Sequence, residues 1–533
     1  MPCCYEDGNG WCKHLETVYK HAGKEYCVFH APQGKKGILL DAFNELVFAR
    51  IREAQEKKKT CDLSGTIFEG NIAFNQFDKN NPLPSMECFK AYFNGFAVFQ
   101  GTHFGGNVDF RETRFRQDAN FMLAQFSMNA TFIGARFRRF TVFMQTLFCE
   151  GAYFSRAQFS ATNFERARFN GHAYFVKTQF SGEGNFQNAL FRKEARFEDT
   201  CFRSLVSFMN AHFNNANFNN ARFNKEGGFM DAQFNGYSSF AFLNVMKKGQ
   251  IIFQDFAGTN TFLNQARFWY LNIEGSLLFE GTDLSEVSFS DTQIQKIDFV
   301  NVKWPRSGLR SWRNVLYDEI DLFEQMKKNN LTPNDDRLKT LYTDYLDFKN
   351  WIKRTVSYGK KYGDQIRKVG ILYRRMKNKY RTLQNWSEVS NWHYGEKEMY
   401  RKENAFRRYL PSFSFLYWLS SGYGERYVRA GVVLAALIFL LSFGLAWTGL
   451  DAAGVSGLNP TDFHGITSIT LGALDLKSIG ALLMNTLKYA TFQKDVLFVP
   501  RNMWGELIRL IAQILIPIQT ALFILAVRNR FRR

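Results

Sequence analysis

The chain has 533 residues, of which 46% are hydrophobic, and carries a formal net charge of +19. This length allows several domains, and the hydrophobic share is ordinary for packed structure. Residues Met1 to Cys12 contain no apolar run, which argues against a secretory signal. The eight scattered cysteines do not have the spacing of a disulfide framework, so we expect the bulk of the protein in the reducing cytoplasm.

The positive charge is concentrated in one part of the chain. About +12 of the excess lies between Arg306 and Arg429, directly before an apolar segment. This position favours a membrane surface over nucleic acid as the partner of the basic residues. We therefore expect no nucleic acid partner.

Residues 1–60 are predicted to form an N-terminal cap with a metal site. The candidate ligands are Cys4, Cys12, Cys27 and His30, and Cys3 or His14 could replace one of them. Three thiolates and one imidazole in the cytoplasm favour zinc, and four protein ligands make the site structural. The alternative is a set of unrelated reduced residues in a small folded cap. Residues Leu39 to Lys59 are predicted to form an amphipathic helix that closes the first coil of the next domain.

Residues 61–304 are dominated by a phenylalanine repeat. The chain contains 57 Phe, and between Phe99 and Phe240 they recur every five or six residues. Neither a helix nor a single strand has this period, which is that of a solenoid. A small residue lies two places before each Phe, as in Ala119 and Phe121, and a narrow interior requires this alternation. The less regular positions Phe253, Phe256, Phe262, Phe268 and Ile273 are expected to continue the repeat.

This pattern resembles the pentapeptide-repeat family. The resemblance implies a right-handed, quadrilateral β-helix in which four units form one coil and the Phe rings stack as a ladder. We expect about 20 to 22 residues per coil, and about ten coils forming a rod of roughly 50 Å, because coils stack at the strand spacing. The rod is not notably acidic, so the DNA mimicry of some family members is not expected. The repeat determines a shape and leaves the ligand of the rod open.

Residues 305–415 are predicted to form a basic α-helical connector. The segment from Tyr373 to Met399 resembles the helical hairpin of pentapeptide-repeat membrane proteins. His393, Glu396 and Glu398 are candidates for acid–base chemistry, but a solvated helix surface explains them better. No phosphate loop, catalytic triad or open metal site is evident in the sequence, so we do not expect an enzyme.

Residues 416–533 are predicted to form a transmembrane domain. Spans are expected at about 428–450 and 503–527, since each apolar run is long enough to cross a hydrocarbon core. Arg426 and Arg429 precede the first span, and Arg528 and Arg530 follow the second. The positive-inside rule then places both ends in the cytoplasm, with the protein as a multi-pass component of the plasma (inner) membrane.

Between the spans, residues 478–492 are apolar but too short to cross, which favours a re-entrant segment. The arrangement resembles the two-helix pore domain of tetrameric cation channels. It lacks a TVGYG-like filter, and Lys494 does not suit a cation pathway, so potassium selectivity is not expected. The predicted ion pathway consists of Thr491, Gln493, Lys494, Asp495, Glu506, Arg509, Gln513 and Thr520.

Pro517 is predicted to act as a hinge in the second span. Because two spans of one chain cannot enclose an aqueous path, the predicted function is an oligomeric ion channel, expected to be a homotetramer. The solenoid would serve its assembly, gating or ligand sensing, with a protein or small molecule as the ligand. The alternative is a membrane-anchored interaction scaffold without conductance, in which polar residues of the second span only join helices.

Overall fold

The computed structural model of the protein describes residues 3–5, 10–256, 263–307, 313–328, 345–403, 413–453, 466–473, 475–494 and 496–531. The chain divides into two compact units, Met1–Asp321 and Leu322–Arg533. The first unit contains the N-terminal cap and a β-solenoid of about 11 turns. The second unit is almost entirely helical.

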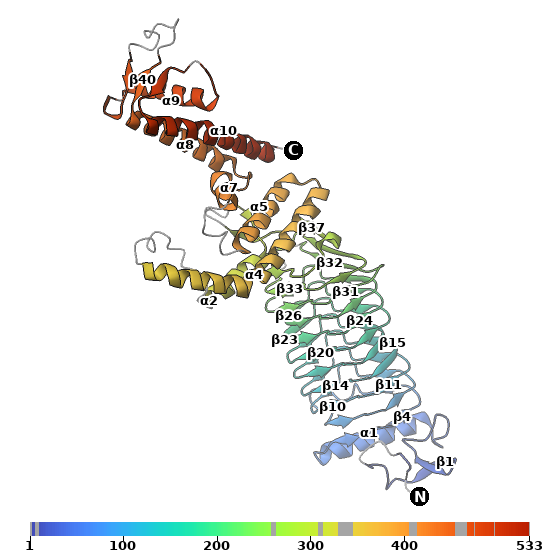
Figure 1. Ribbon diagram of the computed structural model, residues 1–533. Helices are drawn as coiled ribbons and strands as arrows, with labels where there is room; N and C mark the ends of the chain where they lie inside the picture. The colour runs from blue at the N-terminus through green and yellow to red at the C-terminus, as the bar shows by residue number, and fades with distance from the viewer. Residues whose placement is uncertain are drawn as a thin grey trace. The chain divides into compact units, whose positions relative to one another are not determined.

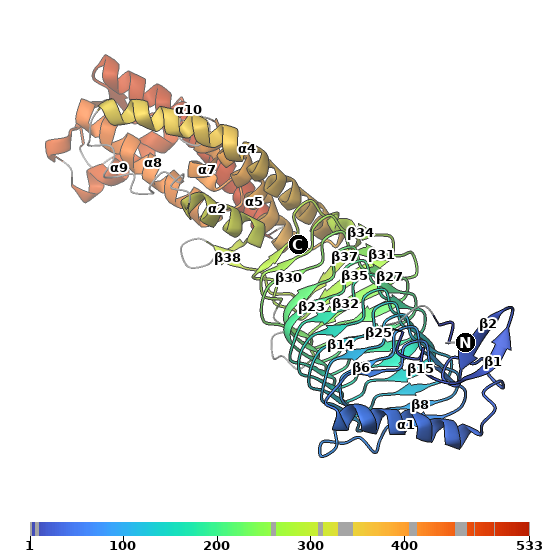
Figure 2. The same cartoon turned by 90° about the horizontal axis from the view of Figure 1, so that it is seen from below.

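The first unit begins with an antiparallel hairpin, β1 (Thr17–His21) and β2 (Lys24–Cys27), followed by helix α1 (Leu40–Glu56). Helix α1 lies across the N-terminal end of the solenoid (Figures 1 and 2). Its apolar residues recur at helical spacing and turn one face toward the first coil. The Phe43 ring lies 6.1 Å from Phe68, and the Phe48 ring lies 5.8 Å from Phe74. Helix α1 therefore closes the first coil, as the sequence predicts.

The solenoid extends from β3 (Cys61–Asp62) to β37 (Ile297–Val300), and most of its strands have only two residues. The strands pair in parallel from one turn to the next. Ala119, for example, pairs with Ala97 in the preceding turn and with Thr141 in the following turn, so each of these turns takes 22 residues. The expected coil length is thus confirmed in the centre of the solenoid. Later turns vary in length: Phe253 pairs with Phe279, and Phe279 in turn pairs with Phe299.

Four ladders of stacked rings fill the interior. In the central turns, neighbouring rings of one ladder are 4.7–5.3 Å apart, centroid to centroid. The ladders there comprise Phe132, Phe154 and Phe175; Phe137, Phe159 and Phe180; Phe143, Phe164 and Phe186; and Phe148, Phe169 and Phe191. Rings of different ladders meet edge to face, which suits the quadrupole of the aromatic ring. The right-handed coil and the square cross-section stay predictions.

The small position two residues before each Phe is buried, as expected. Ala119, Ala124 and Ala130 are each no more than 1% exposed. Where threonine replaces alanine, its hydroxyl needs a partner, because an unbonded buried hydroxyl is destabilising. Thr146 donates to the carbonyl of Phe121 at 2.7 Å, and Thr178 donates to that of Phe154 at 2.8 Å. The hydrogen bonds thus add a second link between successive turns.

The later ladder positions accept smaller side chains. Val245 and Ile273 occupy adjacent turns of one ladder, and Leu263 lies above Phe234 in another. The prediction that Phe256 belongs to the core is wrong, because 67% of its side chain is exposed. Phe262 lies outside the described residues. The spacing of the repeat predicts an inward side chain at Phe256. In the structure, the next buried residue in the described part of the chain that pairs with the preceding turn is Leu263, which pairs with Phe234.

The C-terminal end of the solenoid is also covered. The Trp304 ring packs 5.1 Å from Phe299. Helix α2 (Tyr317–Lys328) begins there, and its Asp318 accepts hydrogen bonds from the Ser288 hydroxyl at 2.5 Å and the Phe289 amide at 3.0 Å. Burial raises the pKa of Asp318 above its ordinary value. Both ends of the repeat core are therefore shielded from water within this unit.

The second unit contains two groups of helices. The long helix α4 (Tyr345–Thr382) packs against α5 (Trp386–Glu403), which confirms the helical hairpin. The C-terminal part comprises α7 (Phe413–Ser421), α8 (Tyr427–Thr448), α9 (Leu476–Ala490) and α10 (Met503–Phe531). A small antiparallel sheet joins β40 (Leu450–Ala452) to β41 (Ser468–Ile469) and β42 (Phe498–Pro500).

Candidate functional site

The first candidate site is a thiol–imidazole cluster in the cap. The ligand atoms of Cys3, Cys12, Cys27 and His30 lie within 4.8 Å of one another, and all four residues are buried. The sequence prediction named Cys4 in place of Cys3, and the structure corrects this choice. Cys4 is half-buried, and its amide donates to the carbonyl of Glu25 at 2.8 Å. Successive residues of an extended segment point to opposite sides, so only one of two adjacent cysteines can face His30.

The imidazole of His30 has two different environments. Its Nδ1 lies 3.2 Å from the Cys27 sulfur and 3.5 Å from the Cys3 sulfur. Its Nε2 lies 2.9 Å from the backbone carbonyl of Ser64, which assigns the proton to Nε2. The lone pair of Nδ1 is then directed toward the thiols, as a metal ligand would be. The Tyr5 ring stacks on the imidazole at 4.1 Å.

The three thiols compete for a single negative charge. The hydrogen bond with Cys27 lowers the pKa of Cys3, to about 3. Burial raises the pKa of Cys12 to about 12, and the hydrogen bond with Cys3 raises the pKa of Cys27. A second thiolate is disfavoured in this small buried volume because like charges repel. A divalent cation supplies the positive charge that three thiolates need, so the donor set fits a metal such as zinc.

The second candidate site is the pair of long apolar helices α8 and α10 in the C-terminal part. Helices Tyr427–Thr448 and Met503–Asn529 are long and apolar enough to cross a membrane, by length and composition alone. They match the predicted spans at 428–450 and 503–527. Ala430 on the first helix accepts a hydrogen bond at 2.9 Å from the amide of Gln519 on the second, and Ser420 accepts another at 3.0 Å.

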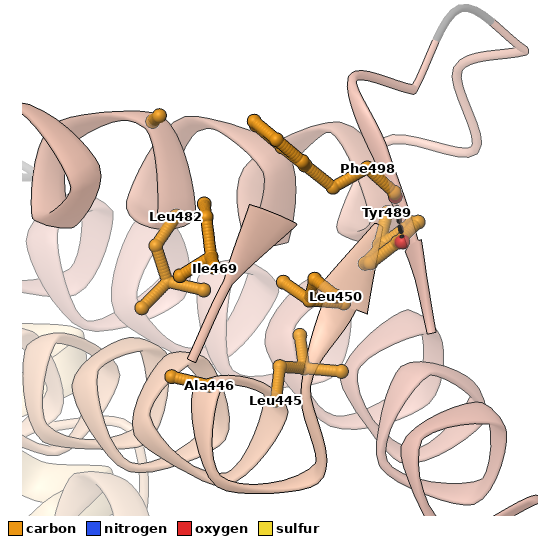
Figure 3. Packing of buried hydrophobic residues seen from close by; sticks show 8 residues of the cluster. Leu445, Ala446, Leu450, Ile469, Leu482, Tyr489 and Phe498 are labelled. Atoms are coloured by element: carbon orange, nitrogen blue, oxygen red, sulfur yellow. Dashed lines mark hydrogen bonds between the residues drawn. The ribbon is translucent and has the colours of Figure 1, made fainter. Parts of the chain in front are cut away.

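Helix α9 and the small sheet form a second apolar core beside these helices. Figure 3 shows Leu482 of α9, Ile469 and Leu450 of the sheet, and Leu445 and Ala446 of α8 packed together. Asp475 directly precedes α9, and its carboxylate accepts from the Ser478 amide at 2.7 Å and caps the first turn.

The chain that follows α9 is held back against the helix. The Asn485 carbonyl oxygen accepts from the amides of Leu497 at 3.0 Å and Phe498 at 3.1 Å. Its amide group and the Tyr489 hydroxyl both donate to the carbonyl of Phe498. Asn485 is fully buried, so these bonds satisfy all of its polar atoms in an apolar setting. The sequence prediction did not include Asn485, and its Asn-x3-Tyr spacing on one helical face was the available signal.

The last residue of α9 lies near the middle of the two long helices. Ala490 belongs to a buried apolar cluster with Ala512 and Ile516 of α10, and Leu437 and Ile438 of α8 pack against this cluster. Residue 437 lies halfway between the ends of α8, Tyr427 and Thr448. The end of α9 therefore lies beside the inner part of the α8–α10 pair, and the chain then returns to the end of α8, where β42 pairs with β40.

The predicted pathway residues Thr491, Gln493 and Lys494 directly follow α9 in the chain. All three are exposed. The Thr491 hydroxyl donates to carbonyls of the preceding helix, Leu487 at 3.1 Å and Lys488 at 3.2 Å. Asp495 lies outside the described residues.

The predicted polar residues of α10 are half-buried and do not converge on the end of α9 as one cluster. Glu506 and Arg509 form an ion pair with each other at 2.8 Å. The Arg509 guanidinium lies 5.7 Å from the centre of the Tyr489 ring on α9. The Thr520 hydroxyl donates to the carbonyl of Ile516, one helical turn earlier, at 2.8 Å.

Pro517 lies inside α10, which continues through it. Proline has no N–H, so the carbonyl of Gln513, four residues earlier, lacks its usual helical donor. The Gln513 side chain is half-buried. This is the backbone weakness that the predicted hinge requires.

The expectation that the connector carboxylates lie on a solvated helix surface is wrong for Glu398. Glu398 is not part of a solvated surface: it is 7% exposed and pairs with Arg401 at 2.6 Å. Tyr423 adds a hydrogen bond at 3.1 Å. Glu396 is half-buried and pairs with Arg374 at 2.8 Å, while burial lowers the pKa of the half-buried His393 to about 4. The Glu396–Arg374 pair joins α5 to α4, whereas Glu398 and Arg401 pair within α5.

Comparison with known proteins supports the repeat. Residues 154–201 match the family described as "Pentapeptide repeats (9 copies)". The chain thus contains pentapeptide repeats. No curated protein and no solved structure matches the chain. The matched residues form the central turns, where the ladders are most regular.

Proposed function

We propose that the protein is an oligomeric ion channel of the plasma (inner) membrane, assembled as a homotetramer. The observation that carries this proposal is the exposure of Thr491, Gln493 and Lys494 directly after Ala490, which packs into an apolar cluster with Ala512 and Ile516 of the membrane-length helix α10. Polar and charged groups at membrane depth are strongly disfavoured against lipid. They are tolerated where they line a water-filled path or meet partner subunits.

Several copies are required because one hairpin cannot enclose a lumen. In the proposed assembly, α9 is a re-entrant helix and the residues after it surround the axis. The remaining pathway residues are Glu506, Arg509, Gln513 and Thr520 of α10, with Pro517 as its hinge. The positive charge of Lys494 and the missing glycine filter argue against potassium selectivity. The solenoid and both chain ends lie in the cytoplasm in this proposal, where the solenoid serves assembly, gating or ligand sensing.

A second candidate function is a membrane-anchored interaction scaffold without conductance. Gln519 favours it, because this buried amide joins α10 to Ser420 and Ala430 within one chain. Polar residues used in this way stabilise an anchor without forming a pathway. In either case we propose a binding or transport role and no catalysis.

The channel proposal is tested by reversing the charge at Lys494. The variant Lys494→Glu, recorded in planar bilayers, should change the cation-to-anion permeability ratio by more than about tenfold if residue 494 lines the path. The matched control is Lys477→Glu, an exposed lysine in the first turn of α9. If both variants conduct with the wild-type ratio, the assignment of the lining is wrong.

We also propose that the cap cluster binds structural zinc through Cys3, Cys12, Cys27 and His30. Their burial and the four donor atoms leave no open position for a substrate. Metal analysis of the purified protein should give about one zinc per chain, and Cys12→Ser should lower this content. Cys4→Ser is the matched control, and an equal loss of zinc in both variants would contradict the ligand set.

A further inference from the structure

The part of the cap before helix α1, which carries the cluster, is too small to be stable alone. Its described residues contain one two-stranded hairpin, β1 and β2, and such a hairpin is at best marginally stable in water. All four cluster residues, Cys3, Cys12, Cys27 and His30, lie in this part of the chain. Small domains of this kind commonly need a metal to fold, because metal binding supplies part of the folding free energy.

The fourth residue connects the cluster to the solenoid. His30 directs Nδ1 toward the thiols and donates from Nε2 to the carbonyl of Ser64, in the first turn of the solenoid. A metal on Nδ1 excludes a proton there and so fixes the proton on Nε2, which is the donor that Ser64 requires. Metal binding and the contact with the solenoid therefore favour the same tautomer.

Two further contacts lie beside this link. The Ile67 amide of the first turn donates to the carbonyl of Phe29 at 2.9 Å. Tyr5, which stacks on His30, covers Gly65, whose φ is +69°. A Cβ atom on Gly65 would lie 2.0 Å from the Cζ atom of the Tyr5 ring. The first turn thus provides a glycine where the ring beside the imidazole needs space.

We propose that the zinc ion locks the cap onto the first turn of the solenoid, through His30 and the carbonyl of Ser64. This inference rests on the zinc site proposed above. Occupancy of the site controls how firmly the N-terminal end of the repeat core is closed. By thermodynamic linkage, a change in the first turn must also alter the affinity for zinc, although it touches no ligand.

The first test measures zinc affinity by competition with a chromophoric chelator in the full-length protein. Gly65→Ala should weaken zinc binding by about tenfold to hundredfold, the usual effect of disturbing a ligand's supporting contacts. The matched control is Gly101→Ala, where φ is +67° but no atom lies within 4 Å of the added Cβ. Both variants carry the same backbone strain, so the difference reports the contact with Tyr5. Equal affinities in the two variants would overturn the lock.

The second test removes zinc from the wild-type protein with a chelator and follows amide hydrogen exchange by mass spectrometry. Exchange should rise by more than about tenfold in the peptide that contains Ile67, while peptides of the central turns stay protected. If the protein binds zinc but exchange at Ile67 is unchanged on its removal, the lock is wrong and the zinc site stands. If the protein binds no zinc, the site itself is refuted, and the lock with it.

Discussion

The stacked interior predicts a large difference between two neighbouring phenylalanines of the same turn. Phe143 is fully buried, with rings of Phe121 and Phe164 stacked on it at 4.7 Å on both sides. Two more rings, Phe132 and Phe154, meet its edge at 5.6 Å and 5.5 Å. The variant Phe143→Ala removes all four contacts and leaves a cavity that the stacked turns cannot fill by collapsing.

We expect Phe143→Ala to lower the free energy of unfolding by about 4 kcal/mol, the middle of the range for buried phenylalanine. Phe140 is 47% exposed and serves as the matched control. Phe140→Ala should change the stability by less than about 1 kcal/mol, as surface substitutions do. The two variants differ only in whether the deleted ring points into the solenoid.

Hydrogen exchange of the full-length protein in detergent measures the effect where it occurs. A loss of about 4 kcal/mol corresponds to a nearly thousandfold rise in the opening equilibrium of the affected turns. The effect should be largest in the turns that contain Phe121 and Phe164, because each repeat contacts only its neighbours. Equal effects of the two substitutions would refute the inward assignment, and unfolding spread evenly over the solenoid would refute nearest-neighbour stabilisation.

Three further predictions concern the helical unit. Burial raises the pKa of Glu425, which accepts a hydrogen bond from Ser390, from 4.5 to about 6. The protonated carboxyl therefore contributes its full stabilisation of the folded protein below pH 4.5, and this contribution is lost as the pH rises through 6. Denaturant titrations should show a loss of about 2 kcal/mol over this interval in the wild type, and none in Glu425→Gln. Asn485→Leu should release the segment around Phe498 and make it sensitive to limited proteolysis, whereas Asn502→Leu should not. Glu398→Ala should lower the free energy of unfolding by about 3 to 5 kcal/mol, because it removes the carboxylate that pairs with the buried Arg401, and a loss below 1 kcal/mol would contradict the buried ion pair.

Much of the solenoid could be predicted because its period is recorded in every turn. A Phe that recurs every five or six residues, with a small residue two places earlier, defines the inward positions without any long-range information. The prediction became wrong at Phe256, where one irregular turn changed the register and Leu263 took the inward position. Repeats reveal a register only while they remain regular.

The candidate sites depended on contacts between distant residues, which spacing does not reveal. Cys3 and Cys4 are equivalent in sequence, and only the path of the chain past His30 selects Cys3. Glu398 is buried because Tyr423 and Arg401 enclose it, whereas its own helix is largely polar. The fold-back after α9 rests on bonds between Asn485 and the backbone of β42, more than ten residues later.

The most direct test of the proposed function is ion flux through the protein itself. Purified full-length protein is reconstituted into liposomes with an entrapped ion-sensitive dye, and flux is followed after an ion gradient is applied. The account predicts protein-dependent flux well above that of empty liposomes, and its dependence on residue 494 identifies the path. Liposomes that remain tight with the protein inserted would contradict the channel and leave a membrane-anchored repeat scaffold.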